Sequence, residues 1–169
     1  AARAEGEARW LLGDAAGARR ALAAPGLASD AGAQDLLARA AYTLGDFAAA
    51  ATAWEAAGHP RGVALARTFA KDPRAVPDYA RLVRASPTDV ALGDEASRAA
   101  VALGAVEALD AALAEPAPGT AALLRQRGRL MERAGRLDLA VVRYREARAL
   151  APDDVDVAAD FARARLASG

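Results

Sequence analysis

The feature that most constrains the fold is a pair of helical periodicities on either side of one glycine, in residues 121–152. The first stripe of apolar or small residues has the four-then-three spacing of one helix face: Leu124, Gly128 and Met131. The second stripe has a three, four, three spacing: Leu137, Ala140, Tyr144 and Ala147. Gly135 lies between the stripes, where a left-handed residue ends a helix at low cost, and Pro152 ends the second helix. The small residues Gly128, Ala140 and Ala147 let the two backbones approach closely, and Tyr144 fills the notch beside them. The segment therefore predicts a tightly packed helical hairpin.

This hairpin resembles the tetratricopeptide repeat (TPR). That family has a small residue in its first helix, a turn glycine, then alanine, an aromatic residue and alanine along the second helix, and a closing proline. The matching residues here are Gly128, Gly135, Ala140, Tyr144, Ala147 and Pro152. The sequence departs from the pattern at Arg127, where the family usually has an apolar residue, and at Leu124, where it often has tryptophan. The resemblance implies an all-α, right-handed superhelix that recognises other proteins.

The rest of the chain contains weaker copies of the same pattern. Leu12-Gly13-Asp14 recurs as Leu44-Gly45-Asp46, and Gly104 precedes Gly135 by 31 residues. A degenerate unit opens at His59-Pro60, with helices expected over roughly 62–70 and 76–84 and a break at Asp72-Pro73. We expect one solenoid domain, 1–169, with approximate repeats 1–28, 29–58, 59–87, 88–118 and 119–152 and a capping helix over 153–167, about eleven helices in all.

Polar residues before each helical stretch predict where the helices begin. Helix N-caps are expected at Ser29 or Asp30, at Asp89, at Thr120, and at Asp153 or Asp154. A further break is expected at Pro116-Ala117-Pro118-Gly119. The acidic run Asp153-Asp154-Val155-Asp156, with Asp160 beyond it, could suggest a cation site, but it lacks the central glycine and terminal glutamate of a calcium loop. We interpret these residues as capping the last helix and complementing its dipole.

Composition excludes several classes of function. The net charge is zero, which argues against a general nucleic-acid or membrane-surface protein, and no apolar stretch is long enough to insert into a membrane. Without cysteine there is no disulfide, thiol catalysis or thiolate metal site. Lys71 is the only lysine among many arginines, which indicates a GC-rich, bacterial genome. A chain starting at Ala1 fits a domain of a longer protein or a mature form after signal removal, so a soluble protein of the cytoplasm or the periplasm is expected.

Nothing in the sequence predicts an active site. The single histidine, His59, lacks a partner for general-base or metal chemistry, and we interpret it as a turn residue. No phosphate loop, nucleophile elbow or paired-histidine motif is present. We therefore expect no enzyme activity, no cofactor and no metal.

In five places an arginine directly follows the small residue of a helix in the repeat pattern: Arg39, Arg67, Arg98, Arg129 and Arg163. In the TPR family this position faces the concave groove. The resemblance thus implies a peptide-binding set on that face: Trp10, Asp35, Arg39, Tyr42, Asp94, Arg98, Arg125, Arg129 and Arg133. A row of guanidinium groups suits carboxylate ligands. The family's Hsp-type carboxylate clamp uses lysine and asparagine, which are absent from the corresponding places.

A structural interpretation competes with this one. Asp35 and Asp94 stand four residues before Arg39 and Arg98, so each pair can neutralise itself within its helix. The fifth repeat is expected to keep uncompensated positive charge at Arg125, Arg129 and Arg133, with Glu132 as a partial offset. The preferred function is a non-catalytic scaffold that holds an extended or helical, acidic segment of another protein. The alternatives are an oligomerisation module and a regulatory segment of a larger multidomain protein.

Overall fold

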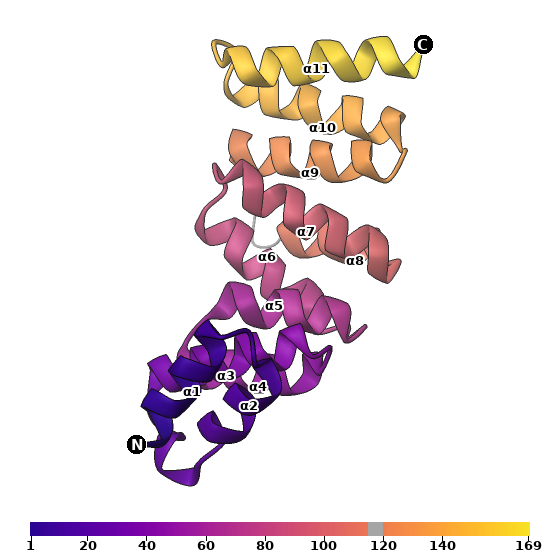
Figure 1. Cartoon of the computed structure of the whole chain (residues 1–169). Coiled ribbons are helices and arrows are strands. Elements are labelled where there is room, and N and C mark those ends of the chain that lie inside the picture. Colours follow the sequence, from indigo (N-terminus) through magenta and orange to yellow (C-terminus); the bar gives the residue numbers. More distant parts are fainter. Residues whose placement is uncertain (115–119) are drawn as a thin grey trace. The chain divides into compact units, whose positions relative to one another are not determined.

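The protein is all-helical in the residues that its computed structural model describes, 1–114 and 120–169, with eleven α-helices and no strand (Figure 1). The elements are α1 (Ala2–Leu11), α2 (Ala15–Leu22), the 3₁₀ turn η1 (Pro25–Leu27), α3 (Ala31–Thr43), α4 (Phe47–Ala57), α5 (Pro60–Phe69), α6 (Ala75–Ala85), α7 (Val90–Leu103), α8 (Val106–Ala114), α9 (Ala121–Arg133), α10 (Leu137–Leu150) and α11 (Val155–Ser168). The predicted all-α class is confirmed. The predicted break at residues 116–119 lies outside the described residues.

The chain divides into two compact units, residues 1–78 and 79–169, with the division inside α6. Unit 1 contains α1 to α5 and the first turn of α6, and unit 2 contains the remainder of α6 through α11. Each of the five predicted repeat ranges holds two of the helices in order, α1 with α2 through α9 with α10. Their assignment to one solenoid domain stays a prediction.

The predicted helix starts are confirmed at the atomic level. Asp30 Oδ1 accepts from the Ala33 amide at 3.0 Å, so Asp30, and not Ser29, caps α3. Asp89 and Thr120 cap α7 and α9 as expected. Asp154 caps α11 by accepting from two backbone amides. Each cap satisfies donors that a helix's first turn leaves without a partner.

The turns within the hairpins share one conformation. Gly13, Gly45, Gly104 and Gly135 all have φ between 64° and 80°, the left-handed region that glycine enters without a Cβ clash. The third hairpin differs, because Lys71 takes the left-handed place between α5 and α6 with φ of 58°. The predicted break at Asp72-Pro73 follows directly. The chain therefore makes the same turn here with a residue that pays a steric cost.

Unit 1 packs around aromatic rings. Tyr42 is at the centre, with the rings of Phe47, Trp54 and Phe69 between 5.3 and 5.6 Å from its own. Alanines of α3 and α4 form the buried surface beneath this group, so the two backbones lie close together. The four rings Tyr42, Phe47, Trp54 and Phe69 are called the aromatic cluster below.

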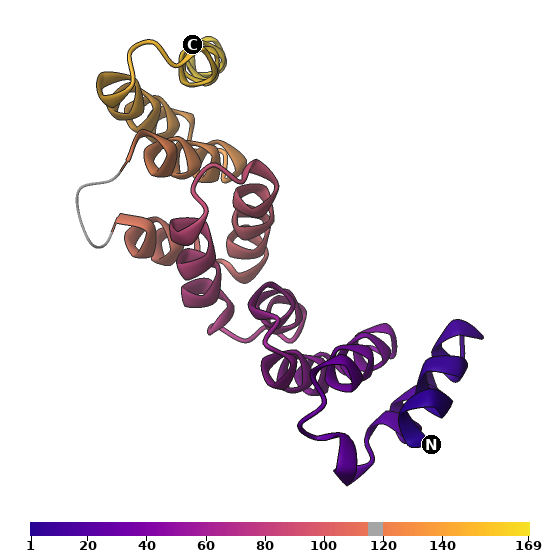
Figure 2. The ribbon, with the colours of Figure 1, turned by 90° about the vertical axis from the view of Figure 1, so that its left-hand side faces the viewer.

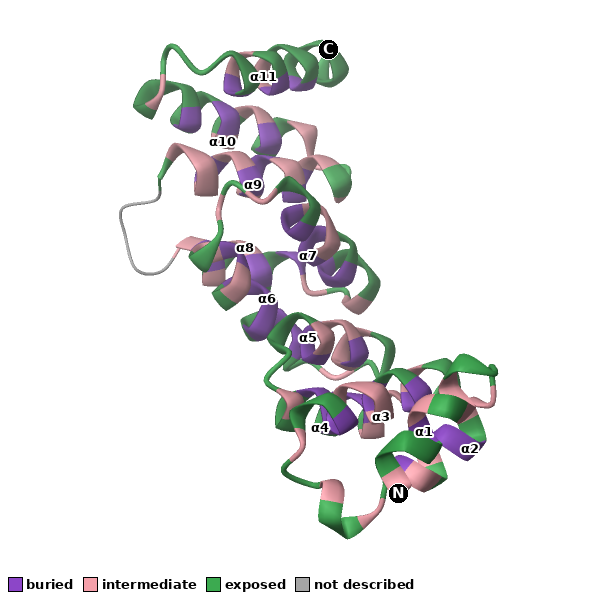
Figure 3. Ribbon diagram, turned by 60° about the vertical axis from the view of Figure 1, so that its left-hand side comes forward, coloured by how far each residue is buried: buried purple, intermediate pink, exposed green. Residues whose placement is uncertain are grey.

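Unit 2 packs through the predicted glycine notch. Tyr144 of α10 is completely buried, and a Cβ added at Gly128 of α9 would lie 2.5 Å from its ring. The close approach predicted for Gly128, Ala140 and Ala147 is thus confirmed. Helices α9, α10 and α11 follow one another as neighbouring layers (Figure 2). Their buried residues lie on the sides that face each other, and the remaining sides of α10 and α11 are largely exposed (Figure 3).

Candidate functional site

The predicted groove residues of unit 1 are held in one polar and one aromatic network. Asp35 accepts from Arg39 Nε at 2.8 Å and from the Trp54 indole N–H at 3.0 Å, which confirms the predicted pairing within α3. His59 Nε2 lies 3.8 Å from the same carboxylate and is exposed at the start of α5. Asp35 is therefore a structural acceptor that joins α3 to α4.

The two aromatic residues predicted to line the groove also contribute to packing. Tyr42 belongs to the aromatic cluster and is partly buried. Trp10 packs against a buried group that contains Leu22 and Ala33. Among the predicted residues of this unit, Arg39 presents the most side chain to solvent, with 54% exposure.

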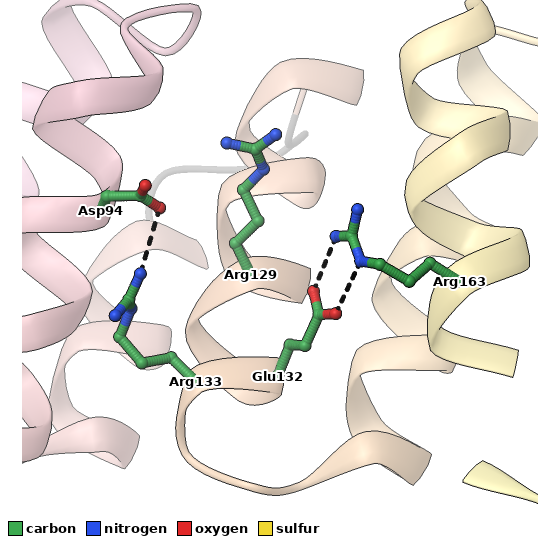
Figure 4. Close-up of a pocket in the computed structure, with 5 residues that line it drawn as sticks. All are labelled: Asp94, Arg129, Glu132, Arg133 and Arg163. Atoms are coloured by element: carbon green, nitrogen blue, oxygen red, sulfur yellow. Dashed lines mark hydrogen bonds and ion pairs between the residues drawn. The ribbon is translucent and has the colours of Figure 1, made fainter. Parts of the chain in front are cut away.

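Unit 2 contains a hollow of about 530 Å³ between α7, α9 and α11, which we call the charged hollow (Figure 4). It is lined by five charged residues: Asp94, Arg129, Glu132, Arg133 and Arg163. Three of them, Asp94, Arg129 and Arg133, belong to the predicted peptide-binding set. Arg163 occupies the arginine position that the family resemblance places on the concave face, although it was not included in that set. In the predicted repeat pattern, α7 and α9 are the first helices of successive hairpins, and α11 is the capping helix that follows them. Part of the predicted peptide-binding set of this unit therefore lies around one depression in the structure.

The expectation of uncompensated charge in the fifth repeat is wrong. Arg125 donates to Asp160 at 2.6 Å and to Asp156 at 3.1 Å. Arg129 lies 3.3 Å from Asp160, and Arg133 lies 3.6 Å from Asp94. The partners come from other helices, α11 and α7, because stacking brings residues about one repeat apart into contact. Counting charges within α9 alone missed them.

Asp160 has a role that differs from the one predicted. Asp154 caps α11, whereas Asp160 lies beyond the first turn and its carboxylate is almost fully buried. Burial alone would raise the pKa of Asp160, but the hydrogen bond from Arg125 and the charges of Arg125, Arg129 and Arg163 lower it below its ordinary value. The signal was present in the sequence, since a carboxylate six residues after the cap is too far along to serve the helix terminus.

Glu132 is engaged by residues other than its arginine neighbours in α9. Both of its oxygens accept from Arg163 at 3.0 Å, and one also accepts from the Tyr144 hydroxyl at 2.8 Å. The hydrogen bonds from Arg163 lower the pKa of Glu132, against the effect of its partial burial. Burial and the carboxylate together raise the pKa of Tyr144. Glu132 thus ties α9, α10 and α11 together at one edge of the charged hollow.

The predicted pair Asp94–Arg98 does not form, since Asp94 pairs with Arg133 of α9. Arg98 is exposed on α7, and across residues 1–114 and 120–169 its guanidinium has no bonding partner. Arg98 is therefore available to a ligand, although it does not line the charged hollow itself.

The departure from the repeat pattern at Arg127 has a local explanation. Arg127 donates to both oxygens of Asp110 in α8 at 2.6 and 2.8 Å, and Arg143 of α10 approaches the same carboxylate at 3.3 Å. Burial would raise the pKa of Asp110, and the two arginines lower it. An ion pair thus replaces the usual apolar contact between two hairpins.

In the part of the chain that the structure describes, no group of three histidine, cysteine, aspartate or glutamate side chains could hold a metal ion. The same residues include no helix with the length and apolar character needed to cross a bilayer.

Comparisons with known proteins identify the fold. No protein-family model and no curated protein matches the sequence. A TPR repeats protein from Bacteroides fragilis has a similar structure, with a TM-score of 0.59 at 12% identity, covering 98% of this chain and 96% of that one. A TPR protein from Thermus thermophilus gives 0.45 at 22% identity, covering 98% and 97%. A tetratricopeptide repeat protein from Parabacteroides merdae gives 0.48 at 12% identity, covering 97% and 70%. The first of these likenesses confirms a TPR-like helical repeat fold, while the handedness of its superhelix stays a prediction.

Proposed function

We propose that this protein is a non-catalytic scaffold whose concave groove holds an extended or helical segment of another protein. The observation that carries the proposal is the charged hollow, in which α7, α9 and α11 contribute five charged side chains to one depression. The TPR-like fold supports it, because stacked helical hairpins present extended binding surfaces. The charged lining favours a polar peptide segment over an apolar small molecule.

The lengths of the ion pairs indicate which arginines can serve the partner. Arg125 is bonded at 2.6 Å to a buried carboxylate, so its role is to hold α11 in place. Arg129 and Arg133 are 3.3 and 3.6 Å from theirs, at or beyond the far end of a hydrogen bond. A carboxylate of the partner can therefore recruit these two guanidinium groups without breaking a tight bond. Arg98 on α7 extends the same surface.

The preference for acidic segments is modest. The hollow has three arginines, Arg129, Arg133 and Arg163, against two carboxylates, so its lining has an excess of one positive charge. Binding should weaken with added salt, because the exposed part of these contacts is screened. In unit 1, Trp10, Asp35, Arg39 and Tyr42 form the proposed second contact surface, with Arg39 as its most accessible member.

Site-specific photocrosslinking tests the proposal. A photoreactive amino acid at Arg98 should capture a partner segment in the source cells, and the same residue at Arg145, exposed on α10, serves as the matched control. The captured segment, synthesised as a peptide, should bind the isolated protein. Arg133→Gln should then weaken binding about fivefold, as expected for loss of one charge-assisted contact, and Arg145→Gln should leave it unchanged. Equal capture at both positions, or equal affinity of both variants, would exclude the charged hollow as the binding site.

A further inference from the structure

The outer face of α11 carries an exposed apolar seam made of Val155, Ala159, Ala162 and Leu166. Val155 and Leu166, at its two ends, are 79% and 86% exposed. The opposite face of the helix contains its buried residues, Val157, Asp160 and Ala164. The seam spacing of four, three and four is that of the apolar positions of a coiled coil. This face of α11 therefore has the pattern of a helix that packs against one more helix (Figure 3).

The seam is symmetric about the midpoint between Asp160 and Phe161. When a second α11 packs against it in the antiparallel direction, Val155 lies opposite Leu166 of the other copy. Ala159 then lies opposite Ala162 of the other copy, so the small residues meet at the centre and allow close approach. A contact between identical chains about a twofold axis requires such a self-complementary surface.

The charges beside the seam also favour an antiparallel copy. Asp156 and Arg163 lie seven residues apart on one flank of α11, with side chains 70% and 56% exposed. In the antiparallel register, Asp156 of one copy is offset from Arg163 of the other by two residues, about 3 Å along the axis. The pair forms twice because of the twofold symmetry. In a parallel copy this flank would lie on the other side of the interface, so Asp156 would not meet Arg163 of the second chain.

These contacts add to bonds that already exist within each chain. Asp156 accepts from Arg125 at 3.1 Å, and Arg163 donates to Glu132 at 3.0 Å. Because both side chains remain more than half exposed, each can approach a second partner. The intermolecular pairs would then extend the ion pairs that join α11 to α9.

We propose that α11 is a self-association surface, on which a second copy of this chain packs its own α11 antiparallel. The four seam residues do not line the charged hollow, although the flanking Arg163 does, and the proposal goes beyond the scaffold function. One pair of 14-residue helices buries less area than a standard stable interface. The dimer should therefore be weak, with a dissociation constant on the order of 100 μM.

Introduced cysteines test the direction of packing. The chain has no cysteine, so any disulfide must come from the introduced thiols. We expect Ala159→Cys and Ala162→Cys each to oxidise poorly alone and to form a mixed disulfide when combined, because these positions face each other across the twofold axis. With a size tag on one variant, the mixed product should exceed the half expected from random collision. Disulfides within each variant at or above the random share would overturn the antiparallel arrangement.

Sedimentation equilibrium tests the surface itself. The native chain should show a concentration-dependent dimer, and Leu166→Glu should raise its dissociation constant about tenfold or more, because a charge replaces an apolar contact. Leu12→Glu is the matched control, since Leu12 is equally exposed but lies beside α1. Circular dichroism checks that both variants fold. A monomer at all concentrations up to roughly five times the expected constant, or a dimer that Leu166→Glu leaves unchanged, would overturn the proposal.

Discussion

The two units share a helical-hairpin plan but join their helices by different interactions. In unit 1 the aromatic cluster joins α3, α4 and α5, with ring centroids between 5.2 and 5.6 Å apart. In unit 2 the helices α8 to α11 are joined by arginine–carboxylate pairs centred on Asp110, Glu132 and Asp160. The comparison shows that one backbone arrangement tolerates either apolar or ionic contacts between its layers.

The difference should govern how each unit responds to solution conditions. Burial of aromatic surface depends little on pH or salt. The carboxylates of Asp110 and Asp160 are mostly buried, so salt screens them weakly, but their protonation removes the bonds. Unit 1 also has paired carboxylates with lowered pKa values, at Asp14, Asp30 and Asp72, but their arginine partners are exposed and these pairs contribute less. One mostly buried pair of unit 1, Arg67 with Asp78, joins α5 to the first turn of α6.

Acidification should produce the largest difference in stability between the two units. The pKa values of Asp110, Glu132 and Asp160 are lowered in the folded state. Their contribution to stability is therefore complete above the unfolded values near pH 4 and is lost as the pH falls through the folded values. Both tryptophans, Trp10 and Trp54, are in unit 1, so their emission reports that unit, whereas far-ultraviolet circular dichroism reports both.

We expect helical signal to fall below about pH 4 before the tryptophan emission shifts. An emission shift that comes first, or both changes together at every salt concentration, would show that ionic contacts do not distinguish the units. In Asp160→Asn the pH values at which the helical signal and the tryptophan emission change should lie closer together. That variant has already lost one of the three carboxylates.

Truncation of Tyr144 should have the next largest effect. The ring is completely buried in the notch at Gly128, so Tyr144→Ala should lower the free energy of unfolding of unit 2 by about 3–5 kcal/mol. Tyr144→Phe, the control, removes only the hydrogen bond to Glu132 and should cost about 1 kcal/mol. Urea denaturation followed by circular dichroism measures both. A small loss for the alanine variant would mean that the notch collapses around the missing ring.

Neutralising Asp160 should be somewhat less damaging. Asp160→Asn leaves Arg125 and Arg129 without their buried carboxylate, and we expect a loss of about 2–4 kcal/mol. Asp156→Asn is a matched change on the same helix and should cost less than about 1 kcal/mol, because Asp156 is mostly exposed. Similar losses in the two variants, measured by urea denaturation, would remove the distinction between buried and exposed pairs.

The smallest effect should come from removing the hydrogen bond between the Trp54 indole and Asp35 in unit 1. Trp54→Phe removes the indole donor to Asp35 and part of the ring surface, and should cost about 1–2 kcal/mol. The loss should be nearly the same at low and high salt. Trp10 remains as a fluorescent reporter of unit 1. A strongly salt-dependent loss would indicate that Asp35 stabilises this unit mainly through its charge.

Local features of the fold could be predicted because their causes lie within a few residues. The caps at Asp89 and Thr120, the turn at Gly135 and the notch at Gly128 all follow from short-range spacing. The partners of Arg125 and Arg133 could not be predicted in the same way. Asp160 is 35 residues from Arg125 in the sequence and meets it only because α11 stacks beside α9 and α10. The net charge around a stacked helix therefore includes the charged residues of the helices packed against it.

The candidate site was predicted only in outline for the same reason. The repeat register placed Asp94, Arg129 and Arg133 around one depression, but Arg163 was not included in the predicted set. Tyr42 was expected to face a ligand, and the structure packs it among Phe47, Trp54 and Phe69 instead of leaving it fully open. An aromatic residue on a first helix is equally suited to a core in a chain with few large side chains.

The left-handed Lys71 has a practical consequence. It is the one lysine of the sequence, and it lies exposed in the turn between α5 and α6. Apart from the chain's α-amino group, its ε-amine is thus the sole site for acylating reagents. A dye or tether attached there would mark unit 1 at a single known point, at a distance in sequence from the arginines of unit 2, and without any engineered residue.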